Sequence, residues 1–210
     1  MLRRNRTFNI FTTSRRAVIL GLASTLMVAG PAAAQISQDQ AESFTKTLVA
    51  ELGGIAKDGA RSEATRDQAY RQALQSRLGS EAIGKFLLKG IPDGAASPDQ
   101  LARYNALFPR YIAAAFATQI GGLAERQINV TQSRARGERE VIVRSELVNS
   151  SGIKKASIDW RIRSIKGQPR LLDVLVERSS PLVTKRQEFS SLVKRDGMAA
   201  LLAHMESVAN

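Results

Sequence analysis

The sequence predicts a single α+β domain in which helices pack against a four-stranded antiparallel sheet. Apolar residues recur at helical spacing up to about residue 120 and again after residue 181. Between residues 126 and 176 they instead alternate with polar residues at the period of a β-strand, in four runs separated by hairpin-length turns. The chain has 210 residues and no internal repeat or low-complexity linker, so we expect one domain of ordinary size.

The first 34 residues are predicted to be a cleaved export signal. An uncharged run over residues 17–29 leads to Ala32-Ala33-Ala34, a small-x-small cleavage pattern, and five arginines come before it: Arg3, Arg4, Arg6, Arg15 and Arg16. Residues 14–20 also resemble a twin-arginine signal, so the Sec and twin-arginine routes both stay open. The run is shorter than the roughly 20 residues that span a bilayer, which disfavours an uncut anchor. We therefore expect a mature domain of residues 35–210 in the periplasm.

Composition narrows the chemistry of that domain. The chain has no cysteine and one histidine, which excludes disulfides, thiolate catalysis and thiolate metal sites and disfavours any other metal centre. Five of the 31 basic residues and none of the 19 acidic ones lie in the first 34 residues, which leaves a net charge of +7. This charge favours an anionic partner, and in the periplasm a membrane face or lipid head group is available whereas nucleic acid is not. The alternative is that the positive charge only keeps the protein soluble.

Three helices are expected before residue 90. Ser37-Gln38-Asp39-Gln40 forms a capping box at the start of the first, which should end near Gly59. The second is expected over residues 62–78 and the third over residues 80–89, before Gly90 and Pro92 break the pattern.

The strongest helix start in the chain is Ser97-Pro98-Asp99-Gln100, where an N-cap serine precedes a proline at the first helical position. The helix should run to about Ile120. One apolar stripe follows it, wider than a surface helix needs, and comprises Leu101, Tyr104, Phe108, Ile112 and Ala115, broadened by Leu107, Tyr111 and Phe116. We expect this helix to pack on more than one side.

The four strands are predicted to form an antiparallel meander. Their apolar positions are Ile128 and Val130, then Val141, Val143 and Leu147, then Ile158, Trp160 and Ile162, and finally Leu172, Val174 and Val176. In the third strand apolar and charged residues alternate, which predicts an apolar face on the core and a charged face toward water or a partner. Two closing helices should follow, separated at Asp196-Gly197.

The junction between the fourth strand and the first closing helix carries Asp173, Val174, Val176, Glu177, Ser180, Arg186 and Phe189. The spacing of these residues resembles the signature of the MlaC family of periplasmic phospholipid-binding proteins, which are associated with toluene tolerance. The chain departs from the family at Arg178, Ser179 and Pro181, where glycine and two apolar residues are usual. The helix start at residues 97–100 and the pair Phe108 and Tyr111 also match, and Gly84-Lys85-Phe86 matches loosely.

The resemblance implies a curved sheet with helices on its concave face, in a nuclear-transport-factor-like cone with an apolar interior. It further implies a carrier that moves phospholipid between an outer-membrane lipoprotein complex and an inner-membrane ABC transporter with an MCE domain, without a cofactor. We expect the lipid to contact Phe108, Tyr111, Ile112, Val141, Val143, Trp160, Ile162, Leu172, Val174, Val176, Leu182 and Phe189. Ordinary core packing is the alternative for each of these residues. A hopanoid-associated branch of the family keeps a sterol-like ligand open.

Several surface cations are candidates to meet acidic partner faces or lipid head groups, namely Arg161, Arg163, Arg178, Lys185 and Arg186. Plain solvation is the alternative for these charges.

A small enzyme is the main rival, because similar cones also host proton-transfer chemistry. His204 is the only histidine and lies in the last helix, where a surface role is expected. Asp159 and Asp173 are out of phase with the apolar residues of their strands and should point away from the interior. We therefore expect no catalytic activity. A two-lobed solute-binding protein is disfavoured by the short chain, and a ligand-free adaptor requires a fully packed interior.

Overall fold

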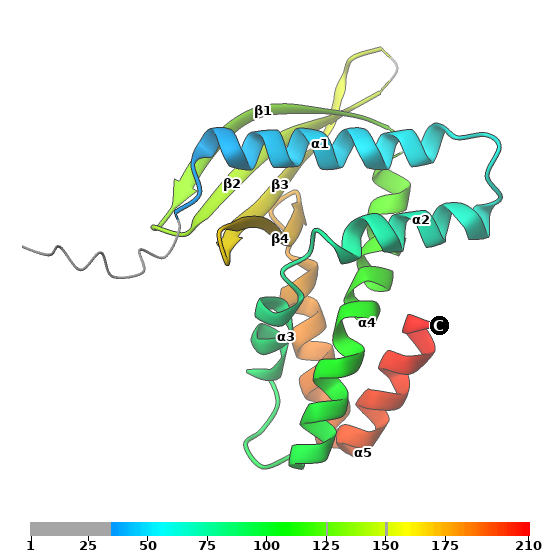
Figure 1. The fold of residues 1–210 in the computed structure, drawn as a ribbon, viewed down its shortest axis with the longest axis vertical. Helices are drawn as coiled ribbons and strands as arrows, with labels where there is room; N and C mark the ends of the chain where they lie inside the picture. Colours follow the sequence, from blue (N-terminus) through cyan, green and yellow to red (C-terminus); the bar gives the residue numbers. More distant parts are fainter. Residues whose placement is uncertain (1–34, 125, 150) are drawn as a thin grey trace, which may run out of the picture. The chain divides into compact units, whose positions relative to one another are not determined.

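The computed structural model describes residues 35–124, 126–149 and 151–210, and the predicted export signal lies outside them. In chain order the elements are α1 (Gln38–Lys57), α2 (Glu63–Gln75), α3 (Ser80–Leu88), α4 (Pro98–Ala124), β1 (Gln127–Arg136), β2 (Glu140–Val148), β3 (Lys154–Ile165), β4 (Gln168–Val176) and α5 (Pro181–Ala209). The strands lie in the order β1-β2-β3-β4, and each neighbouring pair is antiparallel. The α+β class and the meander are thus confirmed (Figure 1).

The predicted helix starts are held by the expected side chains. The Ser37 Oγ accepts from the Gln40 amide at 3.1 Å, and the Gln40 side chain accepts from the Ser37 amide at 3.0 Å. Ser97 and Gln100 repeat this capping box at 3.2 and 3.0 Å. Because both boxes satisfy amides that a helix leaves without partners, α1 and α4 begin where the sequence predicts.

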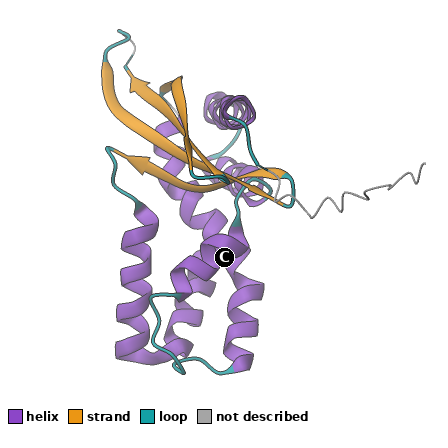
Figure 2. Ribbon diagram, turned by 90° about the vertical axis from the view of Figure 1, so that its left-hand side faces the viewer, coloured by secondary structure: helices purple, strands orange, loops and turns teal. Residues whose placement is uncertain are grey.

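The two expected closing helices form one element, α5, with a kink at Gly197. The backbone there has φ 81° and ψ 171°, a conformation that glycine adopts at little cost. The halves on either side of the kink both contact α4, since the Tyr111 ring lies 5.6 Å from that of Phe189 and 6.2 Å from that of His204. Helices α3, α4 and α5 together form a bundle that extends beyond the sheet (Figure 2).

One face of the curved sheet meets α1 and carries the predicted apolar residues. Val143, Ile158, Trp160 and Ile162 are fully buried there. Figure 1 shows α1 lying along the sheet, to which it contributes Leu48 and Leu52, both buried. This face and the helical bundle share one hydrophobic core.

The opposite face of the sheet carries charge, but it is less open to water than predicted. Asp159 and Asp173 lie on this face, yet they are only 7% and 1% exposed. Arg144 holds Asp159 through two hydrogen bonds of 2.7 and 2.8 Å. Arg161 bridges Glu140 and Asp173 at 3.0 and 3.8 Å. The expectation that this face meets water or a partner was therefore wrong for Asp159 and Asp173, because ion pairs within the face bury them.

Strand β4 departs from the predicted alternation. Its register shifts between the pairs Arg161↔Asp173 and Ile162↔Leu171, which leaves Leu172 as the extra residue of a bulge. Leu171 is consequently fully buried, while Val176 is only partly buried. The predicted apolar stripe of α4 also fails at its first member, because Leu101 is 37% exposed.

Candidate functional site

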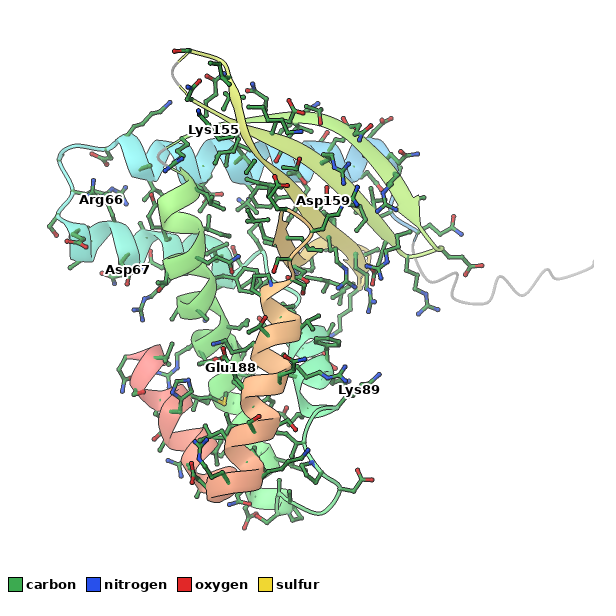
Figure 3. All side chains as sticks on the ribbon, turned by 180° about the vertical axis from the view of Figure 1, so that it is seen from behind. Arg66, Asp67, Lys89, Lys155, Asp159 and Glu188 are labelled. Atoms are coloured by element: carbon green, nitrogen blue, oxygen red, sulfur yellow. The ribbon has the colours of Figure 1, made fainter. Side chains whose placement is uncertain are left out.

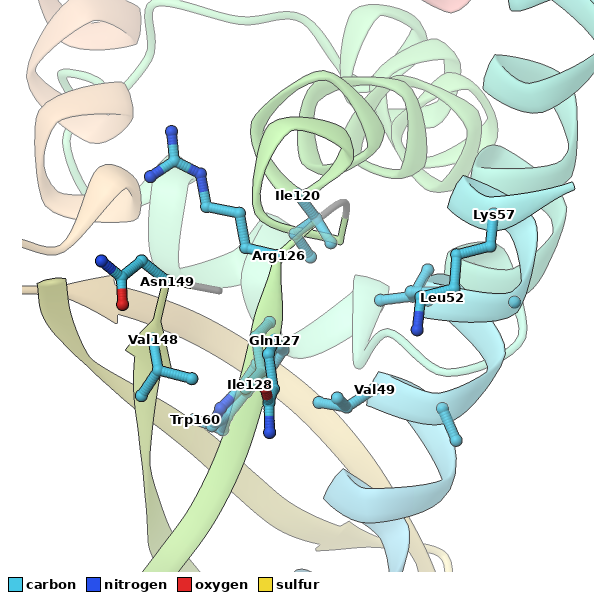
Figure 4. Close-up of a pocket in the computed structure, with 13 residues that line it drawn as sticks. Val49, Leu52, Lys57, Ile120, Arg126, Gln127, Ile128, Val148, Asn149 and Trp160 are labelled. Carbon is cyan, nitrogen blue, oxygen red and sulfur yellow. The ribbon is translucent and has the colours of Figure 1, made fainter. Parts of the chain in front are cut away.

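A cleft with a volume of about 800 Å³ lies between the C-terminal half of α1, the end of α4 and the sheet. We call it the α1–sheet cleft. Its lining residues are Val49, Ala50, Leu52, Gly53, Gly54, Lys57, Ile120, Arg126, Gln127, Ile128, Val148, Asn149 and Trp160 (Figure 4).

The walls of the α1–sheet cleft are mainly apolar. Val49 of α1 faces Ile128 and Trp160 of the sheet in Figure 4. The Trp160 Nε1 donates to the Ser145 Oγ at 2.8 Å, and both residues are fully buried, so the indole offers the cleft its apolar ring and no unpaired donor. On the α1 side, a Cβ added at Gly54 would meet no atom within 4 Å, so the helix leaves open space there.

The edge of the α1–sheet cleft is polar and basic. Lys57 and Arg126 are exposed, and Gln127 and Asn149 lie beside them in the lining. Neither cation forms an ion pair with another described residue. An apolar interior with cations at its edge suits an amphipathic ligand that carries a negative charge.

A second cleft of about 510 Å³ lies between α4 and α5, and Tyr111, Ile112 and Leu182 line it together with Glu188 and His204. We call it the α4–α5 cleft. Within the described residues the Tyr111 hydroxyl is buried without a hydrogen-bond partner, and burial together with the charge of Glu188 raises the pKa of Tyr111 above its usual range.

The twelve residues expected to contact lipid are divided among several places. Trp160 lines the α1–sheet cleft, while Tyr111, Ile112 and Leu182 line the α4–α5 cleft. Phe189 lines an adjoining cleft of about 470 Å³ and Phe108 one of about 330 Å³. The remaining six belong to none of these linings: Val141, Val143, Ile162, Leu172 and Val174 are buried, and Val176 is partly buried.

Sequence reasoning missed most of the lining of the α1–sheet cleft. The unpredicted apolar residues are Val49, Leu52, Ile120, Ile128 and Val148. The one signal in the sequence was the pair Gly53-Gly54 inside a helix, because such glycines weaken a helix and usually have a packing or functional reason.

The titratable groups that an enzyme would need do not converge. His204 is exposed on α5, whereas Asp159 and Asp173 lie on the charged face of the sheet. The hydrogen bond from Arg144 lowers the pKa of Asp159, whereas burial raises the pKa of Asp173 despite a hydrogen bond from Ser180. Among the described residues, no group of three or more histidines and carboxylates is placed to hold a metal ion. Nor does any described helix have the length and apolar character needed to cross a membrane.

The fold and the cleft define a single α+β domain with an open antiparallel sheet and an apolar cleft beside it. A family model described as MlaC protein matches residues 47–207, and the chain therefore belongs to the MlaC family. The fold is also similar to that of a phospholipid-binding protein from Ralstonia solanacearum, whose structure was solved in complex with a phospholipid at 1.53 Å resolution. That likeness has a TM-score of 0.62 at 17% identity and covers 81% of this chain and 97% of the other.

Proposed function

We propose that the protein is a periplasmic phospholipid carrier that holds acyl chain in the α1–sheet cleft. Membership of the MlaC family supports the proposal, as does the shared fold with a protein solved in complex with a phospholipid. The observation that carries it is the make-up of the cleft, where apolar side chains form the walls and Lys57 and Arg126 stand at the edge.

The energetics of lipid transfer explain why such a cleft is needed. At about 0.8 kcal/mol per buried CH₂, a 16-carbon chain exposed to water costs on the order of 13 kcal/mol. A carrier lowers this cost by offering apolar surface in place of water. The volume of about 800 Å³ falls within the roughly 300–1,000 Å³ of ordinary ligand sites. The head group would then stay in water, next to the two cations.

The partners proposed for this carrier are an outer-membrane lipoprotein complex and an inner-membrane ABC transporter with an MCE domain. Three of the five cations suggested for such contacts form ion pairs within the protein. Arg161 and Arg163 pair with Glu140, and Lys185 pairs with Glu188. Arg186 lies over the Phe86 ring at 5.2 Å. Arg178 is exposed and has no ion pair among the described residues, so it is the best placed of the five to meet a partner.

The direct test is native mass spectrometry of the protein expressed in full and purified from a bacterial periplasm, followed by lipid extraction. We expect a mature N-terminus at Gln35 and phospholipid at close to one molecule per protein. A protein that arrives without lipid and takes up none from vesicles would refute the proposal. A hopanoid in the extract would keep the carrier but change its cargo.

A further inference from the structure

Between β2 and β3, Asn149 and residues 151–153 form a turn at one end of the sheet that several hydrogen bonds hold in place. The Asn149 side chain accepts hydrogen bonds from the amides of Ser151 and Ile153 at 3.2 and 2.8 Å. The Asn149 amide donates to the Ile153 carbonyl at 3.0 Å, and Gly152 has a positive φ of 74°. These bonds fix how the turn presents Ile153. Because Asn149 also lines the α1–sheet cleft, the turn and the cleft are adjacent.

Ile153 is the most exposed large apolar side chain in the described part of the chain. It is 59% exposed, compared with 49% for Val183 and 37% for Leu101. A single exposed isoleucine is unremarkable on its own. What distinguishes Ile153 is the set of basic residues around it.

Basic residues surround this end of the molecule. Lys154 and Lys155 follow Ile153 directly and are exposed, and Lys57 and Arg126 stand at the edge of the adjacent cleft. Lys154 forms an ion pair with Glu146 at 3.0 Å. Lys155, Lys57 and Arg126 form no ion pair among the residues that the structure describes. Figure 3 shows Lys155 at the sheet end of the molecule, away from Lys89 on the helical bundle. The result is an exposed apolar tip beside cations, next to the opening of the cleft.

We propose that this turn is the surface with which the protein touches an anionic phospholipid bilayer, so that the α1–sheet cleft opens toward the membrane. The inference rests on the proposed carrier function, because it gives the route by which a lipid enters the cleft. Ile153 would enter the interface while the cations contact lipid phosphates, as in other proteins that lie on membranes. A lipid could then move from bilayer to cleft with little of its acyl chain exposed to water.

The test is co-sedimentation of the purified protein with vesicles of phosphatidylcholine containing phosphatidylglycerol, and with vesicles of phosphatidylcholine alone. A basic residue near an anionic bilayer strengthens binding about fivefold, so the double variant Lys154→Ala with Lys155→Ala should bind about five- to twenty-five-fold more weakly. Ile153→Ser should weaken binding about tenfold by removing buried apolar surface. Binding should also fall at high salt.

Two control variants each make one change of the same kind on the helical bundle, away from the turn. Leu101→Ser removes an exposed apolar side chain from the first turn of α4, and Lys89→Ala removes an exposed cation that follows α3. Both should bind vesicles like the parent protein. Equal binding by the turn variants and the parent, or no binding by the parent to anionic vesicles at low salt, would overturn the inference.

Lipid content, measured on the same samples, separates this inference from the proposed function. Turn variants that keep their phospholipid but bind vesicles as well as the parent would leave the carrier standing and refute the docking surface. A parent protein that holds no phospholipid, yet binds vesicles through the turn, would refute the carrier and support the docking surface.

Discussion

Replacing Gly54 with phenylalanine should close the α1–sheet cleft without harming the fold. Gly54 lies inside α1 and lines the cleft, and a side chain built there would meet no atom within 4 Å. We therefore expect a phenyl ring at this position to extend into space that the proposed acyl chain would occupy. The substitution also removes a glycine from a helix, which should raise the free energy of unfolding by about 0.5 kcal/mol.

The loss of lipid should be large. A phenylalanine side chain takes the room of roughly six methylene groups, and at about 0.8 kcal/mol each the bound chain would lose on the order of 5 kcal/mol of burial. If the chain shifts and recovers half of that amount, its affinity still falls about a hundredfold. We expect the purified Gly54→Phe protein to carry little or no phospholipid in native mass spectra, and to take up little from vesicles.

Gly122→Phe is the matched control. Gly122 lies in α4, has no atom within 4 Å of a Cβ built on it, and does not line the cleft. It should gain a similar stability, measured by urea unfolding, and keep its lipid. A Gly54→Phe protein that folds stably and still binds lipid at the level of the Gly122→Phe protein would show that the cargo does not occupy the α1–sheet cleft. The α4–α5 cleft would then be the site to test next.

Three further predictions concern single residues. Trp160 is the only tryptophan and lines the cleft, so a phospholipid with brominated acyl chains should quench its fluorescence, and quenching absent from a lipid-loaded sample would contradict this placement. Arg178 has φ 65°, so Arg178→Gly should raise the urea midpoint by relieving about 1 kcal/mol of strain, and no change would mean that its side chain contributes as much as the strain costs. Ser180→Ala should lower the free energy of unfolding by about 2–4 kcal/mol at neutral pH, because it removes both the cap of α5 and a 2.6 Å hydrogen bond to buried Asp173. The pKa of Asp173 lies above its unfolded value, so its carboxyl favours folding below about pH 4 and loses that contribution as the pH rises. The loss in Ser180→Ala should therefore shrink toward acid, whereas Ser62→Ala, which removes only a cap, should cost about 1 kcal/mol at either pH.

The sequence predicted the elements better than it predicted the site, for a physical reason. Helix caps such as Ser97 act within one turn of chain, so local patterns report them well. The bulge at Leu172 depends on how β4 meets its neighbours, and Leu171 pairs with Arg77 and Gly79 on its other side through two 2.9 Å backbone bonds. That contact could not be read from the strand alone.

The cleft was harder still to predict, because apolar periodicity marks positions where side chains fill space. A cleft lies where the side chains leave space unfilled. Gly53 and Gly54 supply no side chain to the gap, and Val49 and Ile128 are only partly buried because they border it. Predicted contacts such as Val143 and Ile162 occupy the regular apolar positions of their strands and are fully buried. Trp160 is the one predicted contact that also lines the α1–sheet cleft.

The way in which the charged face of the sheet is covered helps to explain why the helices and the cleft lie on the opposite face. Ile142 points to this face, pairs with Arg161 across β3 and with Arg134 across β1, and is only 4% exposed. Arginine stems can cover apolar surface while their guanidinium groups stay paired, and Glu140 fixes the position of Arg161. The hydrogen bonds from Arg163 and Arg161 outweigh the effect of burial and lower the pKa of Glu140, so this pairing stabilises the fold at neutral pH and weakens as acid protonates the carboxylate. A face covered by its own ion pairs needs no second layer of helices. Helix α1 can therefore pack on the other face, where its C-terminal half forms one wall of the cleft.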